Sequence, residues 1–220
     1  MSFIWDFLRR KITPARVLQN RFMQQNLELL EGEILELGAV NNSRKNLAKK
    51  ATRYRKTNIR THYSEDTEFL DATNIDLTDN SVDAIVSEVM LEHLYNFQGV
   101  IDGCHRVLKP GGKLVMIVPW MYPFHAAPCD YFRFSKPALK NMMSQFHSSE
   151  IEQLGTVWVT ISQHLQLKAW PWSIYPSGSI KRLMPMLPIL VLGLAIYGIS
   201  IVAGKEEDEF ALLYGIVATK

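Results

Sequence analysis

The sequence predicts a single α/β domain built on a doubly wound, mostly parallel sheet. Short apolar runs alternate with helical segments between residues 33 and 118, as strands and helices alternate in such sheets. One run, Lys113–Val118, is continuously apolar, as in a strand buried on both faces. The 220 residues, 47% of them hydrophobic, suffice for one core, and this composition with a charged fraction of 21% argues against a disordered chain.

The first 30 residues predict N-terminal helices. Phe3, Phe7 and neighbouring apolar residues share one helical face. Pro14 separates two helices, and Thr13 is the expected N-cap of the second. The segment is also basic, so it either covers an edge of the sheet or lies on a membrane surface.

The elements of the sheet follow in order. Strands are expected at Glu33–Leu37, Arg53–Ile59 and Asp83–Ser87, helices at Ser43–Thr52 and over most of Val89–Val107, a short strand or turn at Asp71–Ile75, and a turn at Lys109–Gly112. In such sheets ligands bind outside the carboxyl ends of the strands. This rule places Gly38, Glu88 and Pro119–Arg133 on one rim.

Three motifs lie between Asp71 and Phe134. They are DATNIDLTDNSVDAIVSEVMLEHL, RVLKPGGKLVMIVP and YPFHAAPCDYFRF, in that order. Together they resemble the second half of a class I S-adenosylmethionine-dependent methyltransferase of the type 11-like kind. The resemblance covers about residues 30–150 and the last strand. It implies a Rossmann-like sheet of seven strands with an antiparallel last strand, and S-adenosylmethionine as the cofactor.

The resemblance also implies a cofactor site. Glu36 and Gly38 match the acidic residue and the first glycine of the family's glycine-rich loop, but Val40 and Asn42 stand at the next two glycine positions. Side chains there crowd a loop that must approach the cofactor closely. Asn58 stands where an acidic residue usually holds the ribose, with Asp66 as its rival. The further implied cofactor contacts are Asp71, which accepts from the adenine amino group, and Ala72, Ser87, Glu88 and His93.

The segment Tyr122–Phe134 resembles a bacterial subgroup with the signature P-x-H-x-x-P-x-D-Y-x-R-[FW]-[ST], often associated with surface polysaccharides or lipid-linked glycans. His125 is the expected catalytic base, because an imidazole titrates near neutral pH. Asp130 either orients it or acts itself. Tyr131 and Arg133 are expected to bind substrate, Arg133 through a phosphate. The alternative is that Asp130 and Arg133 pair and hold the loop closed.

An apolar insertion at residues 165–208 precedes the last predicted strand, Phe210–Thr219. Within it, Leu183–Ala203 has 21 residues and no charge, which is long enough to span a bilayer. A single crossing would separate the last strand from its sheet. The segment is therefore expected to be a buried helix, a contact in a homo-oligomer or an element at the membrane interface, and Pro185 and Pro188 interrupt its first turns.

Two functions fit the sequence. The first is a methyltransferase that O-methylates a sugar or a lipid-linked glycan, in the cytoplasm and peripheral on the inner face of the membrane. The second is a catalytically inactive binding or scaffold subunit at the membrane, which Val40, Asn42 and Asn58 favour. The small net charge of +2 and the lack of an NPPY-like tetrapeptide disfavour nucleic acid. Cys104 and Cys129 form no ligand pattern, so no metal site is predicted.

Overall fold

The computed structural model describes residues 13–40, 44–46, 48–60, 65–125, 129–169, 187–203 and 210–220. The chain divides into two compact units, each described here by itself. The sheet unit comprises residues 22–120, 124–152 and 214–220. The helical unit comprises residues 1–21, 121–123 and 153–213. The prediction that the whole chain is one domain stays a prediction.

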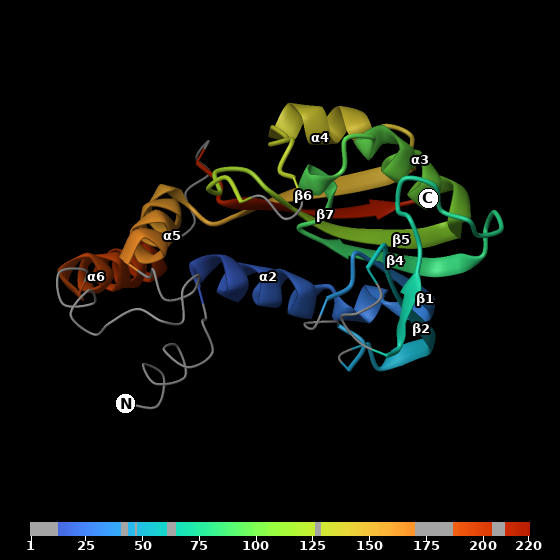
Figure 1. The fold of residues 1–220 in the computed structure, drawn as a ribbon, viewed down its shortest axis with the longest axis horizontal. Helices are drawn as coiled ribbons and strands as arrows, with labels where there is room; N and C mark the ends of the chain where they lie inside the picture. The colour runs from blue at the N-terminus through green and yellow to red at the C-terminus, as the bar shows by residue number, and fades with distance from the viewer. Residues whose placement is uncertain are drawn as a thin grey trace. The chain divides into compact units, whose positions relative to one another are not determined.

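A seven-stranded sheet has the strand order β3-β2-β1-β4-β5-β7-β6 (Figure 1). Its strands are β1 (Glu31–Leu37), β2 (Lys50–Asn58), β3 (Thr67–Phe69), β4 (Val82–Glu88), β5 (Leu108–Pro119), β6 (Ser148–Leu154) and β7 (Leu213–Thr219). β1 pairs in parallel with β2 and β4, while β2 pairs in parallel with β3 and β4 with β5. The predicted doubly wound, mostly parallel sheet is therefore confirmed.

The last strand runs antiparallel to β5, as expected. Gly111, near the start of β5, donates its amide to the carbonyl of Lys220 just after β7, at 2.9 Å, and Lys220 donates to Gly112 at 3.0 Å. The turn predicted at Lys109–Gly112 is wrong, because these residues belong to β5 and pair with the end of the chain. Gly111 still adopts a φ of 79°, which explains why a glycine stands there.

Two helices lie on the same side of the sheet, α3 (Phe97–Val107) and α4 (Lys136–Met142) (Figure 1). The predicted helix at Val89–Val107 is thus a 3₁₀ turn, η3 (Leu91–His93), followed by α3. Asn96 caps α3 by accepting from the amide of Gly99 at 3.2 Å. The buried residues of α3 are Val100, Ile101, Cys104 and Val107, and Leu114–Val118 of β5 are fully buried as predicted.

The connection between β1 and β2 differs from the expectation. The helix predicted at Ser43–Thr52 is wrong: residues 44–46 form a bend and turn, and β2 already begins at Lys50. Twelve residues separate the two strands, which is about the minimum for a parallel crossover. The segment Asp71–Ile75 is a turn that follows β3 rather than a strand.

Helix α2 (Pro14–Gln25) begins where the sequence predicts it. The side-chain oxygen of Thr13 accepts from the amide of Arg16 at 3.3 Å, so Thr13 is the N-cap. The first predicted helix falls on residues 1–12, outside the described residues.

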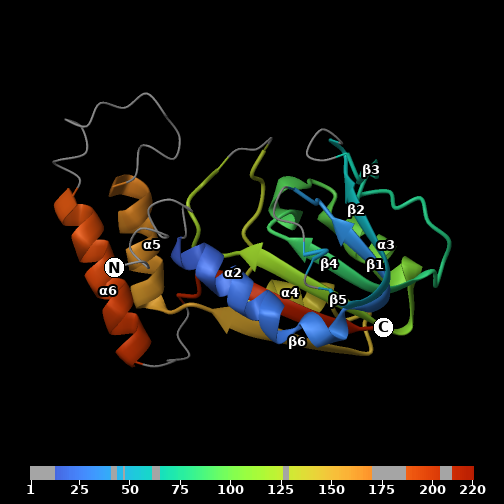
Figure 2. The same cartoon turned by 90° about the horizontal axis from the view of Figure 1, so that it is seen from below.

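In the helical unit, α5 (Val157–Ala169) and α6 (Leu187–Ala203) lie side by side (Figure 2). The hydroxyl of Ser162 donates to the carbonyl of Gly193 at 2.7 Å. A Cβ at Gly193 would lie 3.2 Å from Gln166, so the glycine permits the close approach of the two helices.

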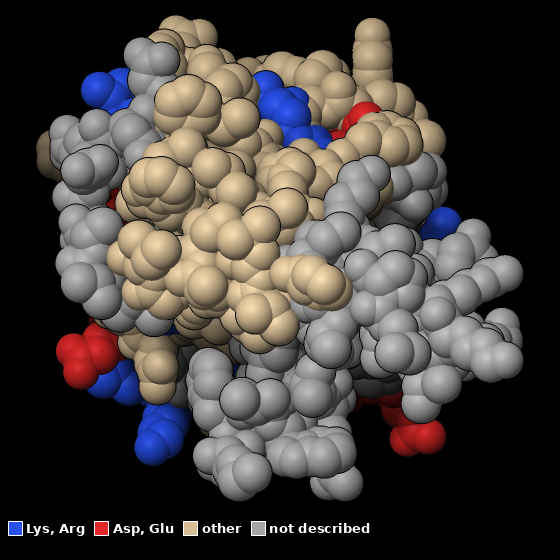
Figure 3. Space-filling model, turned by 90° about the vertical axis from the view of Figure 1, so that its left-hand side faces the viewer, with Lys and Arg blue, Asp and Glu red and all other residues tan. Residues whose placement is uncertain are grey.

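Other parts of α6 are exposed, including Val191, Leu192 and Ile199, each more than half exposed. The described surface on this side consists mostly of uncharged residues (Figure 3). In the part of the chain that the structure describes, no helix combines the length and the apolar character needed to cross a membrane. The predicted membrane contact and homo-oligomer contact of this segment stay predictions.

Candidate functional site

The candidate site lies at the carboxyl ends of β1, β4 and β5. Leu37 at the end of β1 pairs with Ser87 of β4, and Glu88 pairs with Ile117 of β5. The residues that follow these strands therefore meet at one edge of the sheet, which is where parallel sheets bind ligands.

Gly38 follows β1 with a φ of 71°, a backbone conformation that residues with a Cβ rarely adopt. A Cβ at Gly38 would lie 2.8 Å from Cγ of Met90 and 2.9 Å from its sulfur. Val40, which the sequence marks as an obstacle to the cofactor, is 44% exposed, so its side chain does not fill a buried position. Asn42 lies outside the described residues.

The end of β2 is tied to the loop after β1. The side-chain amide of Asn58 donates to the carbonyl of Ala39 at 3.0 Å, and its oxygen accepts from the amide of Arg60 at 2.9 Å. Its rival Asp66 pairs with Lys45 at 2.9 Å. In this conformation Asn58 holds the loop in place, and its ribose contact stays a prediction.

An ion pair that the sequence reasoning missed occupies the same edge. The guanidinium of Arg44 donates to both carboxylate oxygens of Glu88, at 2.6 and 2.7 Å, and both side chains are largely buried. Burial lowers the pKa of Arg44, but the hydrogen bonds and charge of Glu88 outweigh it and leave this pKa raised. Glu36, also buried, adds to the negative charge around Arg44.

The remaining predicted cofactor residues lie at the ends of β3 and β4. Asp71 is exposed, and one of its carboxylate oxygens accepts from the amide and the hydroxyl of Thr73, both at 2.8 Å. Ala72 and Ser87 are buried, and the hydroxyl of Ser87 lies 4.0 Å from the sulfur of Met90. His93 belongs to the separate cluster described below.

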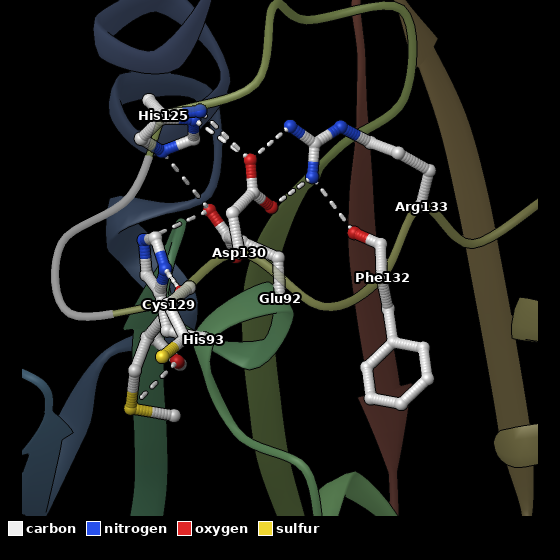
Figure 4. A network of polar contacts seen from close by, with 9 residues as sticks. Glu92, His93, His125, Cys129, Asp130, Phe132 and Arg133 are labelled. Carbon is white, nitrogen blue, oxygen red and sulfur yellow. Dashed lines mark hydrogen bonds and ion pairs between the residues drawn. The ribbon is translucent and has the colours of Figure 1, made fainter.

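The loop after β5 is held by a buried carboxylate (Figure 4). Asp130 accepts from the backbone amide of His125 at 2.9 Å and from both terminal nitrogens of Arg133, one of them at 2.6 Å. These bonds from Arg133 are the main cause of the lowered pKa of Asp130, which falls to about 2. The pairing that the sequence analysis kept as an alternative is therefore present, since the Arg133 guanidinium is engaged within the loop.

A second carboxylate lies beneath this loop. Glu92 is fully buried, and neither of its carboxylate oxygens has a hydrogen-bond partner among the described residues. Burial raises its pKa to about 8. Its Oε1 lies 3.7 Å from Nε2 of His93 and 3.9 Å from Nε2 of His125, and the two imidazole rings meet edge to face (Figure 4).

The backbone around this cluster is strained and fixed. Val89, two residues before η3, has a φ of 45°, which is unfavourable for a β-branched residue. Its amide donates to Ile117 at 2.8 Å, and the amide of Tyr131 donates to the carbonyl of Glu92 at 2.8 Å. The second bond fastens the loop to η3. Tyr131 itself is half exposed and packs edge to face on the exposed ring of Tyr95.

Residues 24–116 match the family model described as a methyltransferase domain. No curated protein matches the chain. Among solved structures, the chain is similar to an S-adenosylmethionine-dependent methyltransferase from Archaeoglobus fulgidus, with a TM-score of 0.62, 15% identity, and coverage of 100% of this chain and 99% of that one.

The similarity to a methyltransferase domain therefore covers fewer than half of the 220 residues. The chain is also similar to phosphoethanolamine N-methyltransferase 2 of Haemonchus contortus in complex with S-adenosyl-L-methionine, with a TM-score of 0.57 and 14% identity over 98% of this chain, but it spans only 59% of that protein. A third similar structure, the [4+2]-cyclase SpnF, has a TM-score of 0.56 and 15% identity, over 90% of this chain and 81% of that one. At these identities the structures show the fold alone.

The family match and the fold support an S-adenosylmethionine-dependent methyltransferase with S-adenosylmethionine as its cofactor. The residues at this edge of the sheet fit this group in two respects. Gly38 has a left-handed backbone conformation and no Cβ, so the cofactor can approach the chain closely there. Glu36 and Asp71 place carboxylates near the ends of β1 and β3, where they could accept from amino and hydroxyl groups.

Proposed function

We propose that the chain transfers a methyl group from S-adenosylmethionine to a hydroxyl of a sugar or of a lipid-linked glycan. In this reaction the sulfonium methyl moves to the acceptor oxygen, S-adenosylhomocysteine leaves, and the hydroxyl gives up its proton. The enzyme must align the oxygen with the methyl group and provide for the departing proton.

The observation that carries the proposal is the buried Asp130 with its two partners, His125 and Arg133. In this arrangement an imidazole lies on the loop after β5, beside the edge that holds the residues expected to bind the cofactor. The Nδ1 atom of His125 lies 3.4 Å from Asp130, and 37% of the His125 side chain is exposed. A polar cluster of this kind, partly open to solvent, suits the removal of a proton from a hydroxyl.

Two exposed aromatic rings support a sugar as the acceptor. Tyr95 and Tyr131 pack on each other beside the loop, and they remain 76% and 49% exposed. Aromatic faces pack well against the apolar faces of sugar rings. Because Arg133 is bound to Asp130, we propose that its main role is to hold the loop. To bind a phosphate, Arg133 would have to leave Asp130.

The test begins with calorimetric titration of S-adenosylmethionine and S-adenosylhomocysteine into the full chain. Binding should be followed by transfer of labelled methyl groups to hydroxyl-bearing sugars and lipid-linked glycans. His125→Ala should lose transfer while its affinity for S-adenosylmethionine is unchanged, and the exposed His147→Ala is the matched control. Binding of the cofactor without transfer to any hydroxyl acceptor would refute the proposed substrate class.

One observation favours the second candidate function, an inactive binding or scaffold subunit at the membrane. Arg44 occupies both oxygens of Glu88 at the edge where the cofactor is expected. If the pair never opens, the Glu88 carboxylate cannot contact a cofactor. Absence of S-adenosylmethionine binding to wild-type protein, with binding gained in Arg44→Ala, would favour this function. Peripheral binding on the inner membrane face through α6 belongs to either proposal, and vesicle sedimentation tests it.

A further inference from the structure

Glu92, His93 and His125 form a cluster with the composition of a metal site. Each offers one ligand atom, and these three atoms lie within 4.8 Å of one another. Two histidines and one carboxylate form the protein ligand set of known catalytic zinc sites and of non-haem iron sites, which leave further positions for water or substrate. We propose that these three residues bind a divalent transition-metal ion such as Zn²⁺.

The carboxylate is the strongest observation. Glu92 is fully buried, and both its oxygens lack hydrogen-bond partners among the described residues. A buried polar group without a partner is costly, and buried charges are normally paired or coordinate a metal. The two imidazoles that approach it stand at 3.7 and 3.9 Å, too far for hydrogen bonds. A cation between the three groups would satisfy the carboxylate.

Both imidazoles are oriented as ligands. His93 places Nδ1 against the carbonyl of Cys129 and its Nε2 toward Glu92. His125 places Nδ1 3.4 Å from the carboxylate of Asp130 and its Nε2 toward the same Glu92 oxygen (Figure 4). A carbonyl or carboxylate at the far nitrogen of a ligating histidine fixes its tautomer and raises its basicity as a ligand. His93 has a carbonyl at this position, and His125 has a carboxylate.

The distances require a small contraction. Ligand atoms around one tetrahedral zinc ion lie about 3.4 Å apart, given bonds of about 2.1 Å. The distances from Glu92 Oε1 to the Nε2 atoms of His93 and His125, 3.7 and 3.9 Å, exceed this value by a few tenths of an ångström. All three ligand atoms lie within 4.8 Å of one another, so no distance in the cluster exceeds this value by more than about 1.4 Å. His125 is the most exposed of the three and lies on a loop, so its side chain is the one that can move. The same exposure leaves an open side for an acceptor.

This inference rests on the proposed function and changes one of its steps. With the ion bound, His125 would be a ligand, and the acceptor hydroxyl could occupy an open position on the ion. A bound cation makes such a hydroxyl more acidic and stabilises the developing oxygen charge. The charges would also suit an ion, since Asp130 is already bound to Arg133, while the ion-pair contacts of Glu92 among the described residues are with the two histidines.

The test uses the full chain without a histidine tag. Metal is removed with a chelator, and Zn²⁺ and Co²⁺ are titrated by calorimetry and by the absorption of Co²⁺. We expect about one ion per chain and a four-coordinate Co²⁺ spectrum. Glu92→Gln and His125→Ala should each weaken binding by at least about tenfold, while the exposed controls Glu150→Gln and His147→Ala should not change it.

The outcomes separate cleanly. The metal site is refuted if folded wild-type protein binds neither ion, or if both cluster variants bind as tightly as wild type. We expect His125→Ala to fold even if Glu92→Gln does not, because the His125 side chain is partly exposed on a loop. Titration of S-adenosylmethionine on the same samples reports on the proposed function by itself. Metal binding without cofactor binding would refute the methyltransferase proposal and leave the metal site standing.

Discussion

Replacing Gly38 with alanine tests the fit of the cofactor edge most directly. The backbone of Gly38 has a φ of 71°, and the left-handed region costs a residue with a Cβ about 1–2 kcal/mol. The new methyl would lie 2.8 and 2.9 Å from Cγ and sulfur of Met90, so this side chain must leave its rotamer, at about 1 kcal/mol. The reduced entropy of the unfolded chain returns about 0.4–1 kcal/mol.

Gly38→Ala should therefore lower the free energy of unfolding by about 1–2.6 kcal/mol. Urea unfolding, followed by circular dichroism, measures it. Because part of the loss comes from Met90, the double variant Gly38→Ala with Met90→Ala should show a coupling of about 1 kcal/mol relative to the two single variants. Unchanged stability in Gly38→Ala would show that this edge is not built as described. Additive losses would show that Met90 does not crowd the position.

Three further predictions concern other contacts in the protein. The carboxylate of Asp83 accepts hydrogen bonds from Lys109 and from the amide of Glu33, and these bonds lower the pKa of Asp83. Above pH 3.8, Asp83→Asn should therefore lower the free energy of unfolding by about 1 kcal/mol. The difference in stability between variant and wild type should vanish as the pH falls through the lowered pKa of Asp83. Arg44→Met should lower the free energy of unfolding in urea by about 3 kcal/mol, because it leaves the largely buried Glu88 uncompensated, and adding Glu88→Gln should recover most of this loss. Gly193→Val should loosen α6 from α5 and speed proteolysis between them, without changing the melting of the sheet.

Much of the fold was predictable because its strands are continuous apolar runs. Lys113–Val118 and Asp83–Ser87 fall within β5 and β4, and the resemblance supplied the antiparallel last strand. The helix at Ser43–Thr52 failed for a tertiary reason. Its composition suits a helix, but the buried pairing of Arg44 with Glu88 holds the segment in a turn. A local sequence pattern cannot predict this pair, because Arg44 and Glu88 lie 44 residues apart in the chain.

The candidate site was predictable only in part. The positions of Gly38, Glu88 and His125 at one edge follow from the rule for parallel sheets. The two cysteines predicted no metal site, and the resemblance assigned His93 to the cofactor rather than to a metal. A signal was available: an adjacent Glu-His pair follows one predicted strand and a histidine follows the next, and neighbouring parallel strands end at the same edge. What could not be read is that Glu92 turns inward and loses all contact with solvent.

The structure also changes how the altered glycine loop is judged. Val40 and Asn58 favoured an inactive protein, yet Val40 is exposed and Asn58 fastens the loop rather than leaving it open. The obstacle to the cofactor is instead the pair of Arg44 and Glu88, whose carboxylate is already taken. If the cofactor uses Glu88, binding must break this pair, and its affinity falls by the free energy of breaking it. A variant that weakens the ion pair between Arg44 and Glu88 should then raise the affinity for the cofactor.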